Sequence, residues 1–169
     1  MEHLSLQDKR TRLRIISGVS ILLLVFYLAA QFGNIRNTTI VYEGLKIRLP
    51  FSAEMKTEKP DRTVYYDRVE DEATIDRARN VSFEKCAWTA EEYETKKEEL
   101  IADAYRKQFG EKDTPEYRWV YVLTDTGPEI YRAYVLDPQS GKAWTVQSYR
   151  ITEKQFKESL DRVSFVPAE

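Results

Sequence analysis

The chain has 169 residues, with 26 basic and 28 acidic side chains, a formal net charge of −2 and a single cysteine. The acidic balance argues against nucleic acid as a partner, and one cysteine excludes an intrachain disulfide, so stability has to come from packing. The only histidine is His3, which leaves the rest of the chain without the side chain most often used as a metal ligand or general base. We therefore expect no metal and no cofactor.

The N-terminal segment has the pattern of a membrane anchor. Lys9, Arg10, Arg12 and Arg14 precede eighteen uncharged positions, residues 15–32. As a helix this segment is about 27 Å long, close to the ~30 Å of a bilayer core, and its basic flank is expected on the cytoplasmic side. The sequence therefore predicts a cytoplasmic tail (1–14), a transmembrane anchor (15–32), a short tether (33–39) and an extracytoplasmic domain (40–169) in a single-pass membrane protein.

Two residues inside the predicted span have further expected roles. Tyr27 suits the membrane interface, and Gly18 permits the close approach of another helix. A cleaved signal peptide is the alternative to an anchor. Cleavage after Ala30 places Leu28 where a small residue is preferred, which favours an uncleaved anchor.

Short strands are expected at the start of the domain. Residues 39–51 read as two strands separated by the turn at Glu43-Gly44, and the second alternates apolar residues with Lys46 and Arg48. Residues 52–61 read as a polar loop. Two further strands are predicted, at residues 63–69 and 79–88, around an acidic connector.

Two helices are predicted from their N-terminal caps. Thr89 with Glu92 forms a capping box, and apolar residues recur at helical spacing as far as Phe109, with Gly110 as the stop. Thr152 with Gln155 forms a second capping box before the final helix. Between these helices, strands are expected at residues 117–124, 129–136 and 142–151.

The resulting fold class is α+β. The short connections between the last three strands favour an antiparallel meander. The strand at 117–124 is apolar on both sides and needs cover on both. We expect an antiparallel sheet of about six strands flanked by two helices, one on each face, after the transmembrane helix.

Three local phrases carry a resemblance to a known group of proteins. They are the run GLKIRLP at 44–50, the helix start TAEEY at 89–93, and Phe156 and Leu160 followed by the VSF of 163–165. Over about residues 40–166 the chain resembles the PsbP-like superfamily, which includes the extrinsic photosystem II protein, the Ran-binding Mog proteins and bacterial DcrB-like envelope proteins. The resemblance implies an α/β/α sandwich and a role in binding other proteins or as an accessory subunit.

Aromatic residues in the predicted strands are the candidate binding residues. Tyrosine and tryptophan are enriched at interfaces, yet they also form strands and cores, and the pattern leaves both readings open. The candidates are Tyr65, Tyr66, Trp119, Tyr131, Tyr134, Trp144 and Tyr149.

Other sequence patterns give weaker indications of function. The acidic connector at 70–76 lacks the ligand spacing of a calcium loop and reads as a solvated connector. Asn37 and Asn80 each begin a glycosylation sequon. Neither a nucleophile motif nor a phosphate loop is present.

We therefore expect a non-enzymatic binding domain or accessory subunit, located at the cell membrane with another membrane or envelope protein as its partner. Binding of a small apolar ligand and carboxylate-based catalysis are the alternatives.

Overall fold

The structure is a computed structural model that describes residues 20–21, 23, 37–67 and 72–166, with only the backbone described at 72 and 73. The chain divides into two units, Met1–Arg36 and Asn37–Glu169. The second unit holds every strand that the structure describes.

The predicted transmembrane helix is contradicted. Within the described ranges, no helix combines the length and the apolar character that crossing a membrane requires. Of the predicted span only Ser20, Ile21 and Leu23 are described. The other positions of the span lie outside the described residues, as do the predicted anchor residues Lys9, Arg10, Arg12, Arg14, Gly18 and Tyr27.

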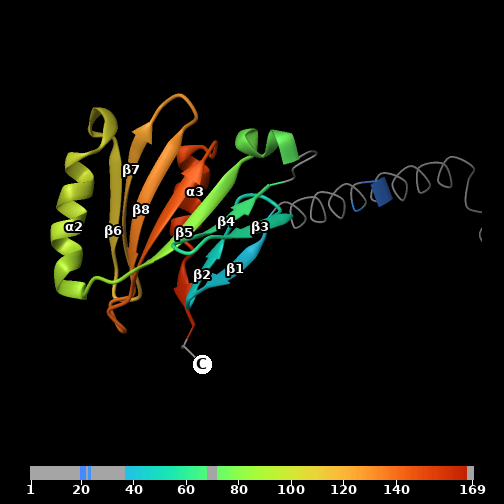
Figure 1. Ribbon diagram of the computed structural model, residues 1–169. Helices are drawn as coiled ribbons and strands as arrows, with labels where there is room; N and C mark the ends of the chain where they lie inside the picture. Colours follow the sequence, from blue (N-terminus) through green and yellow to red (C-terminus); the bar gives the residue numbers. More distant parts are fainter. Residues whose placement is uncertain (1–19, 22, 24–36, 68–71, 167–169) are drawn as a thin grey trace, which may run out of the picture. The chain divides into compact units, whose positions relative to one another are not determined.

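Ten strands and two α-helices make up the described part of the domain (Figure 1). The helices are α2 (Ala90–Ala102) and α3 (Glu153–Leu160), with 3-10 turns η1 (Glu72–Arg77) and η2 (Tyr105–Lys107). The strands are β1 (Thr39–Tyr42), β2 (Leu45–Arg48), β3 (Met55–Glu58), β4 (Thr63–Tyr66), β5 (Asn80–Cys86), β6 (Phe109–Asp113), β7 (Arg118–Asp125), β8 (Ile130–Leu136), β9 (Ala143–Tyr149) and β10 (Ser164–Phe165).

The strands form two antiparallel sheets, which corrects the predicted single sheet of about six strands. The larger has the order β3-β4-β5-β9-β8-β7-β6 and the smaller the order β1-β2-β10. The strands that the sequence prediction missed, β3, β6 and β10, all lie at sheet edges. Edge strands are half solvated and carry charged residues, so their hydrophobic pattern is weak.

One face of the large sheet is covered along most of its width. The small sheet and α3 contribute Ile47, Leu49, Phe156 and Leu160 to a core that includes Phe83 of β5. Strands β7, β8 and β9 add further side chains to this core. We call this side the packed face; in the view of Figure 1, α3 lies behind the sheet.

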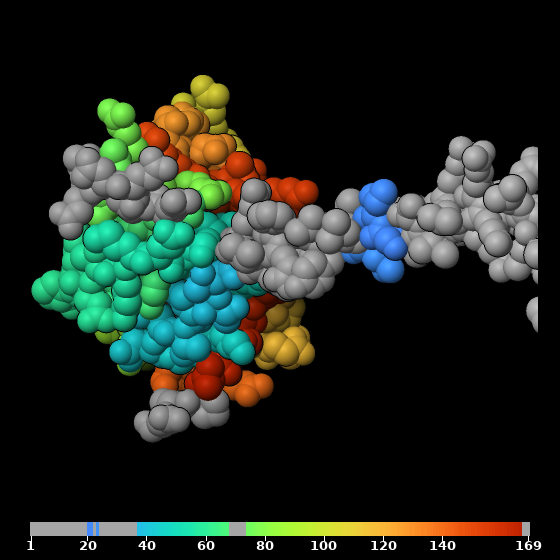
Figure 2. Space-filling model, turned by 90° about the vertical axis from the view of Figure 1, so that its right-hand side faces the viewer, coloured from blue at the N-terminus to red at the C-terminus, as the bar shows by residue number. Residues whose placement is uncertain are grey.

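The opposite face is covered only at one end. There α2 packs on β7 and β8, where Tyr93 and Leu100 contact a smaller core containing Val120, Val122 and Leu136. Figure 1 shows α2 beside the β6 end of the sheet. Figure 2 views the domain from the end where β1 to β4, in cyan to green, lie at the surface.

The first predicted helix is shorter than its apolar spacing suggested. It ends at Ala102, with Asp103 as its C-cap, and Phe109 begins strand β6 instead. Between them Arg106 and Lys107 have φ angles of +52° and +57°, which end any right-handed helix. The chain therefore turns back here and forms an edge strand beside β7.

Both predicted capping boxes are present. The Thr89 hydroxyl accepts a hydrogen bond from the Glu92 N–H, and the Glu92 carboxylate accepts one from the Thr89 N–H at 2.7 Å. Hydrogen bonds that the Glu92 carboxylate accepts lower its pKa, first the one from the Thr89 backbone N–H and then the one from the Thr89 hydroxyl. The same arrangement joins Thr152 and Gln155 at the start of α3.

Replacing Thr89 with alanine is expected to lower the free energy of unfolding by about 1 kcal/mol, because one N-terminal amide of α2 loses its partner. Since the pKa of Glu92 is lowered in the folded state, its contribution is present above the unfolded pKa and is lost as the pH falls through the folded pKa. The cost of Thr89→Ala should therefore shrink at low pH. Urea titrations at neutral and acidic pH measure both effects. Thr126→Ala, in an exposed turn, is the control; an equal loss in the control would contradict the capping account.

Candidate functional site

The face of the large sheet beyond α2 is the candidate site. Cross-strand register places its side chains in three rungs across β8, β9, β5 and β4. We call these residues the open face: Ile130, Tyr149, Asn80 and Tyr66 in the first rung; Arg132, Gln147, Ser82 and Val64 in the second; Tyr134, Thr145 and Glu84 in the third.

The open face is more polar than the packed face. Alternation along β9 explains the difference, because Trp144 and Val146 face the core while Thr145 and Gln147 face the other way. Arg132 and Glu84 are exposed, and the neighbouring Gln147 is half-buried. A sheet face with this composition is suited to hydrogen bonding with a partner rather than to covering by a helix.

The second and third rungs surround a shallow hollow of about 280 Å³. Its lining comprises Arg62, Ser82, Glu84, Trp88, Arg132, Tyr134, Thr145 and Gln147. Trp88, just before α2, packs edge-on against Tyr134 with ring centroids 4.5 Å apart. The hollow thus has an aromatic wall on the α2 side and polar side chains along the strands.

Basic groups without acidic partners define the charge of this hollow. Among the described residues, neither Arg62 nor Arg132 forms an ion pair, and the only side-chain hydrogen bond of Arg132 goes to Gln147 at 3.4 Å. Glu84 is the one acidic residue in the lining. Two guanidinium groups against one carboxylate give the hollow a positive charge in a chain whose net charge is −2.

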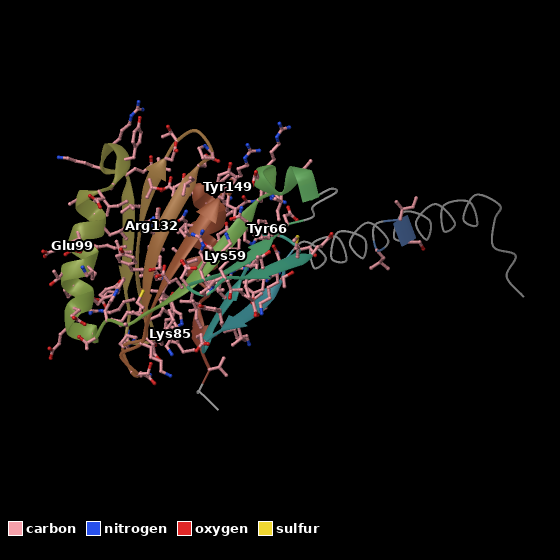
Figure 3. The ribbon with its side chains drawn as sticks, viewed as in Figure 1. Lys59, Tyr66, Lys85, Glu99, Arg132 and Tyr149 are labelled. Carbon is pink, nitrogen blue, oxygen red and sulfur yellow. The ribbon has the colours of Figure 1, made fainter. Side chains whose placement is uncertain are left out.

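The seven predicted aromatic candidates divide between the two faces. Trp119, Tyr131 and Trp144 are at most 3% exposed and belong to the core of the packed face. Tyr65 also faces that side, edge-on to Phe83. The remaining three, Tyr66, Tyr134 and Tyr149, are half-buried on the open face. Figure 3 labels Tyr66 on β4, Tyr149 on β9 and Arg132 on β8.

Burial raises the pKa values of two side chains on this side of the sheet. The pKa of Tyr134 is raised by burial, an effect that the nearby Arg132 partly opposes. Burial also raises the pKa of the Cys86 thiol, whose sulfur lies 3.2 Å from the Thr145 hydroxyl. A thiol with a raised pKa is a weak nucleophile at neutral pH, so Cys86 has the character of a small strand residue.

The carboxylates show no arrangement suited to acid catalysis in the described part of the chain. The displaced carboxyl pKa values, those of Glu58, Glu92 and Asp113, are all lowered by hydrogen-bonding partners. A general acid needs the opposite shift. Over the same residues, no group of three or more histidine, cysteine or acidic side chains is placed to hold a metal ion. Glu70 and Asp71 of the acidic connector lie outside the described residues.

A second hollow of about 620 Å³ lies on the packed side, beside β10 and Trp144 of β9. Trp144 and Phe165 stack in its lining at 5.4 Å, beside Tyr117 and Val163. The Trp144 Nε1–H is buried without a hydrogen-bond partner among the described residues. Glu116 and Lys142 lie in the more polar part of the lining.

Comparison with known proteins does not name a family for this chain. No protein-family model matches it, and the comparison with curated proteins found no match. The resemblance to PsbP-like proteins stays a prediction.

The sequence did not point to Trp88, Arg132, Arg62 or Gln147 as site residues. Arg132 and Gln147 do stand at polar positions of alternating strands, and that alternation marks a solvent-facing side. The missing information was which strands lie next to each other. Arg62 reaches the hollow only because β4 pairs with β5, which begins at Asn80.

Proposed function

We propose that this domain is a non-enzymatic binding module that acts as an accessory subunit by holding a partner protein on the open face. The observation that carries the proposal is the uneven covering of the large sheet. One face is buried under α3 and the small sheet, whereas the other combines half-exposed aromatic rings with hydrogen-bonding side chains beyond the end of α2.

The composition of the open face supports a protein partner. Tyrosine, tryptophan and arginine are the residues most enriched where protein interfaces gain their binding energy. Tyr66 lies on β4, Tyr149 on β9 and Trp88 in the loop before α2, around the polar centre. A volume of about 280 Å³ is below the usual range of drug-sized ligand pockets, and it suits a few side chains of a partner.

Site-specific photo-crosslinking in cells tests this proposal. A benzoylphenylalanine in place of Tyr149 is expected to give one dominant adduct, because that ring lies half-exposed on the open face. Lys157, exposed on α3 at the packed side, is the matched control position. Adducts of equal yield at both positions, or none at Tyr149, would show that the open face does not hold a partner.

Binding of a small apolar ligand is the second candidate, favoured by the hollow beside Trp144. Its volume of about 620 Å³ falls in the range of ligand pockets, and five of its lining residues have aromatic or aliphatic side chains, Tyr117, Trp144, Val163, Phe165 and Val166. Sodium decanoate is then expected to raise the melting temperature of the chain, and Phe165→Ala to reduce that rise. No change in melting temperature over millimolar decanoate would remove this candidate.

A further inference from the structure

The charged residues of the open face indicate what kind of partner it binds. This step rests on the binding function proposed above. Arg62 lies just before β4, and Arg132 extends from β8, on opposite sides of the hollow. Neither has an acidic partner among the described residues. A guanidinium group presents a planar fork of donors that matches a carboxylate, so two such groups around one hollow favour an anionic ligand.

Three half-buried basic residues elsewhere in the domain differ in this respect. Arg118 pairs with Glu94 and Asp113, Lys112 with Asp161, and Lys97 with Glu94 and Glu111. In the lining of the hollow, by contrast, the one acidic residue is Glu84, which forms no ion pair with a described residue. The positive charge of the hollow is therefore not neutralised within the domain.

The remaining lining residues favour a polypeptide. Ser82, Thr145 and Gln147 offer both donors and acceptors along adjacent strands, which suits the backbone of an extended segment. Trp88 and Tyr134 offer an aromatic surface for an apolar side chain beside it. Two arginines next to a glutamate form a smaller basic patch than the stripe of positive charge with which proteins bind nucleic acid.

We infer that the open face binds an acidic polypeptide segment, with Arg132 and Arg62 pairing its carboxylates and Trp88 and Tyr134 contacting an adjacent apolar side chain. Glu84 opposes this binding, because it places a like charge beside the ligand's carboxylates. If removing the charge of Glu84 tightens binding, the charges of the hollow hold the ligand. If it does not, the binding is non-specific.

Binding of labelled hexaglutamate to the full-length chain, followed by fluorescence anisotropy at low salt, tests the inference. Hexaglutamine is the uncharged counterpart. Arg132→Ala and Arg62→Ala are each expected to raise the Kd about fivefold, which corresponds to roughly 1 kcal/mol, the upper end of the range for an exposed ion pair. Glu84→Gln is expected to lower the Kd. Arg162→Ala is the control, since Arg162 is an exposed arginine that follows α3 and lies outside the hollow.

Three results would overturn the inference. One is equal binding of hexaglutamine, and another is a loss with Arg162→Ala as large as that with Arg132→Ala. The third is tighter binding of a six-nucleotide oligothymidine with the same dependence on Arg132, which would assign the face to nucleic acid. If crosslinks still form at Tyr149 in cells in any of these cases, partner binding stands and only the acidic chemistry is wrong; their absence removes both.

Discussion

Replacing Phe156 with alanine is expected to lower the free energy of unfolding by about 3–5 kcal/mol, the range for large aromatic-to-alanine changes in a core. Phe156 is 1% exposed and lies between α3 and the sheet. Its ring stacks on Tyr131 with centroids 5.8 Å apart and meets Tyr121 edge-on at 6.1 Å. The variant leaves a cavity and removes both ring contacts, so α3 loses its main attachment to the packed face.

Urea denaturation measures this loss, with Phe109→Ala as the matched control. Phe109 is 43% exposed on edge strand β6, and its truncation should cost no more than about 1 kcal/mol. Comparable losses for the two variants would mean that α3 is not held on the packed face as described.

Replacing Gly110 with alanine is expected to destabilise the domain by about 1–3 kcal/mol, because the added methyl group overlaps a packed ring. A Cβ atom at this position would lie 2.6 Å from Cε1 of Tyr121 and 2.8 Å from its Oη. The ring cannot move aside easily, since Tyr121 is 3% exposed and its hydroxyl donates a 2.7 Å hydrogen bond to Glu153. The pairing of β6 with β7 therefore depends on glycine here.

Gly127→Ala is the control for this effect. Gly127 lies in an exposed turn, where the nearest atom to an added Cβ is Asp125 Oδ1 at 3.5 Å. That variant should change stability by less than about 0.5 kcal/mol. If Gly110→Ala were equally neutral in thermal and urea unfolding, the close approach of β6 to Tyr121 would be wrong.

Several elements of the fold could be predicted from local sequence. The cap residues Thr89 and Thr152 marked the starts of both helices, because capping depends on residues only three positions apart. Strand β2, with its alternating apolar and basic residues, and the apolar strand β7 could also be predicted, because each pattern lies within one short segment. These features need no knowledge of distant contacts.

The end of α2 and the edge strands could not be read in this way. Apolar spacing continues to Phe109, but the chain leaves the helix at Asp103 and pairs with β7 through Glu111 and its neighbours. A two-residue strand such as β10 exists only because Phe165 lies opposite Leu45 of β2. Such pairings are decided by tertiary contacts between segments far apart in the sequence.

The candidate site was predictable only in part. Three of the predicted aromatic residues, Tyr66, Tyr134 and Tyr149, lie on the open face, while the others fill the packed side. Composition alone does not separate these groups, because tyrosine suits both a core and an interface. Which face a side chain lies on depends on the register of its strand, because a shift of one residue would move every side chain to the opposite face. The predicted extracytoplasmic location is untested by the described residues and stays a prediction.

Hydroxyl-radical footprinting of the full-length chain in intact cells, compared with the purified chain, tests the central claim most directly. If a partner occupies the open face, Trp88, Tyr66 and Tyr149 should be oxidised less in cells than in the purified protein. Tyr105 and Phe109, both exposed and outside the open face, should be oxidised equally in the two samples. Equal oxidation of the open-face rings in both samples, or protection confined to Tyr105 and Phe109, would contradict the account.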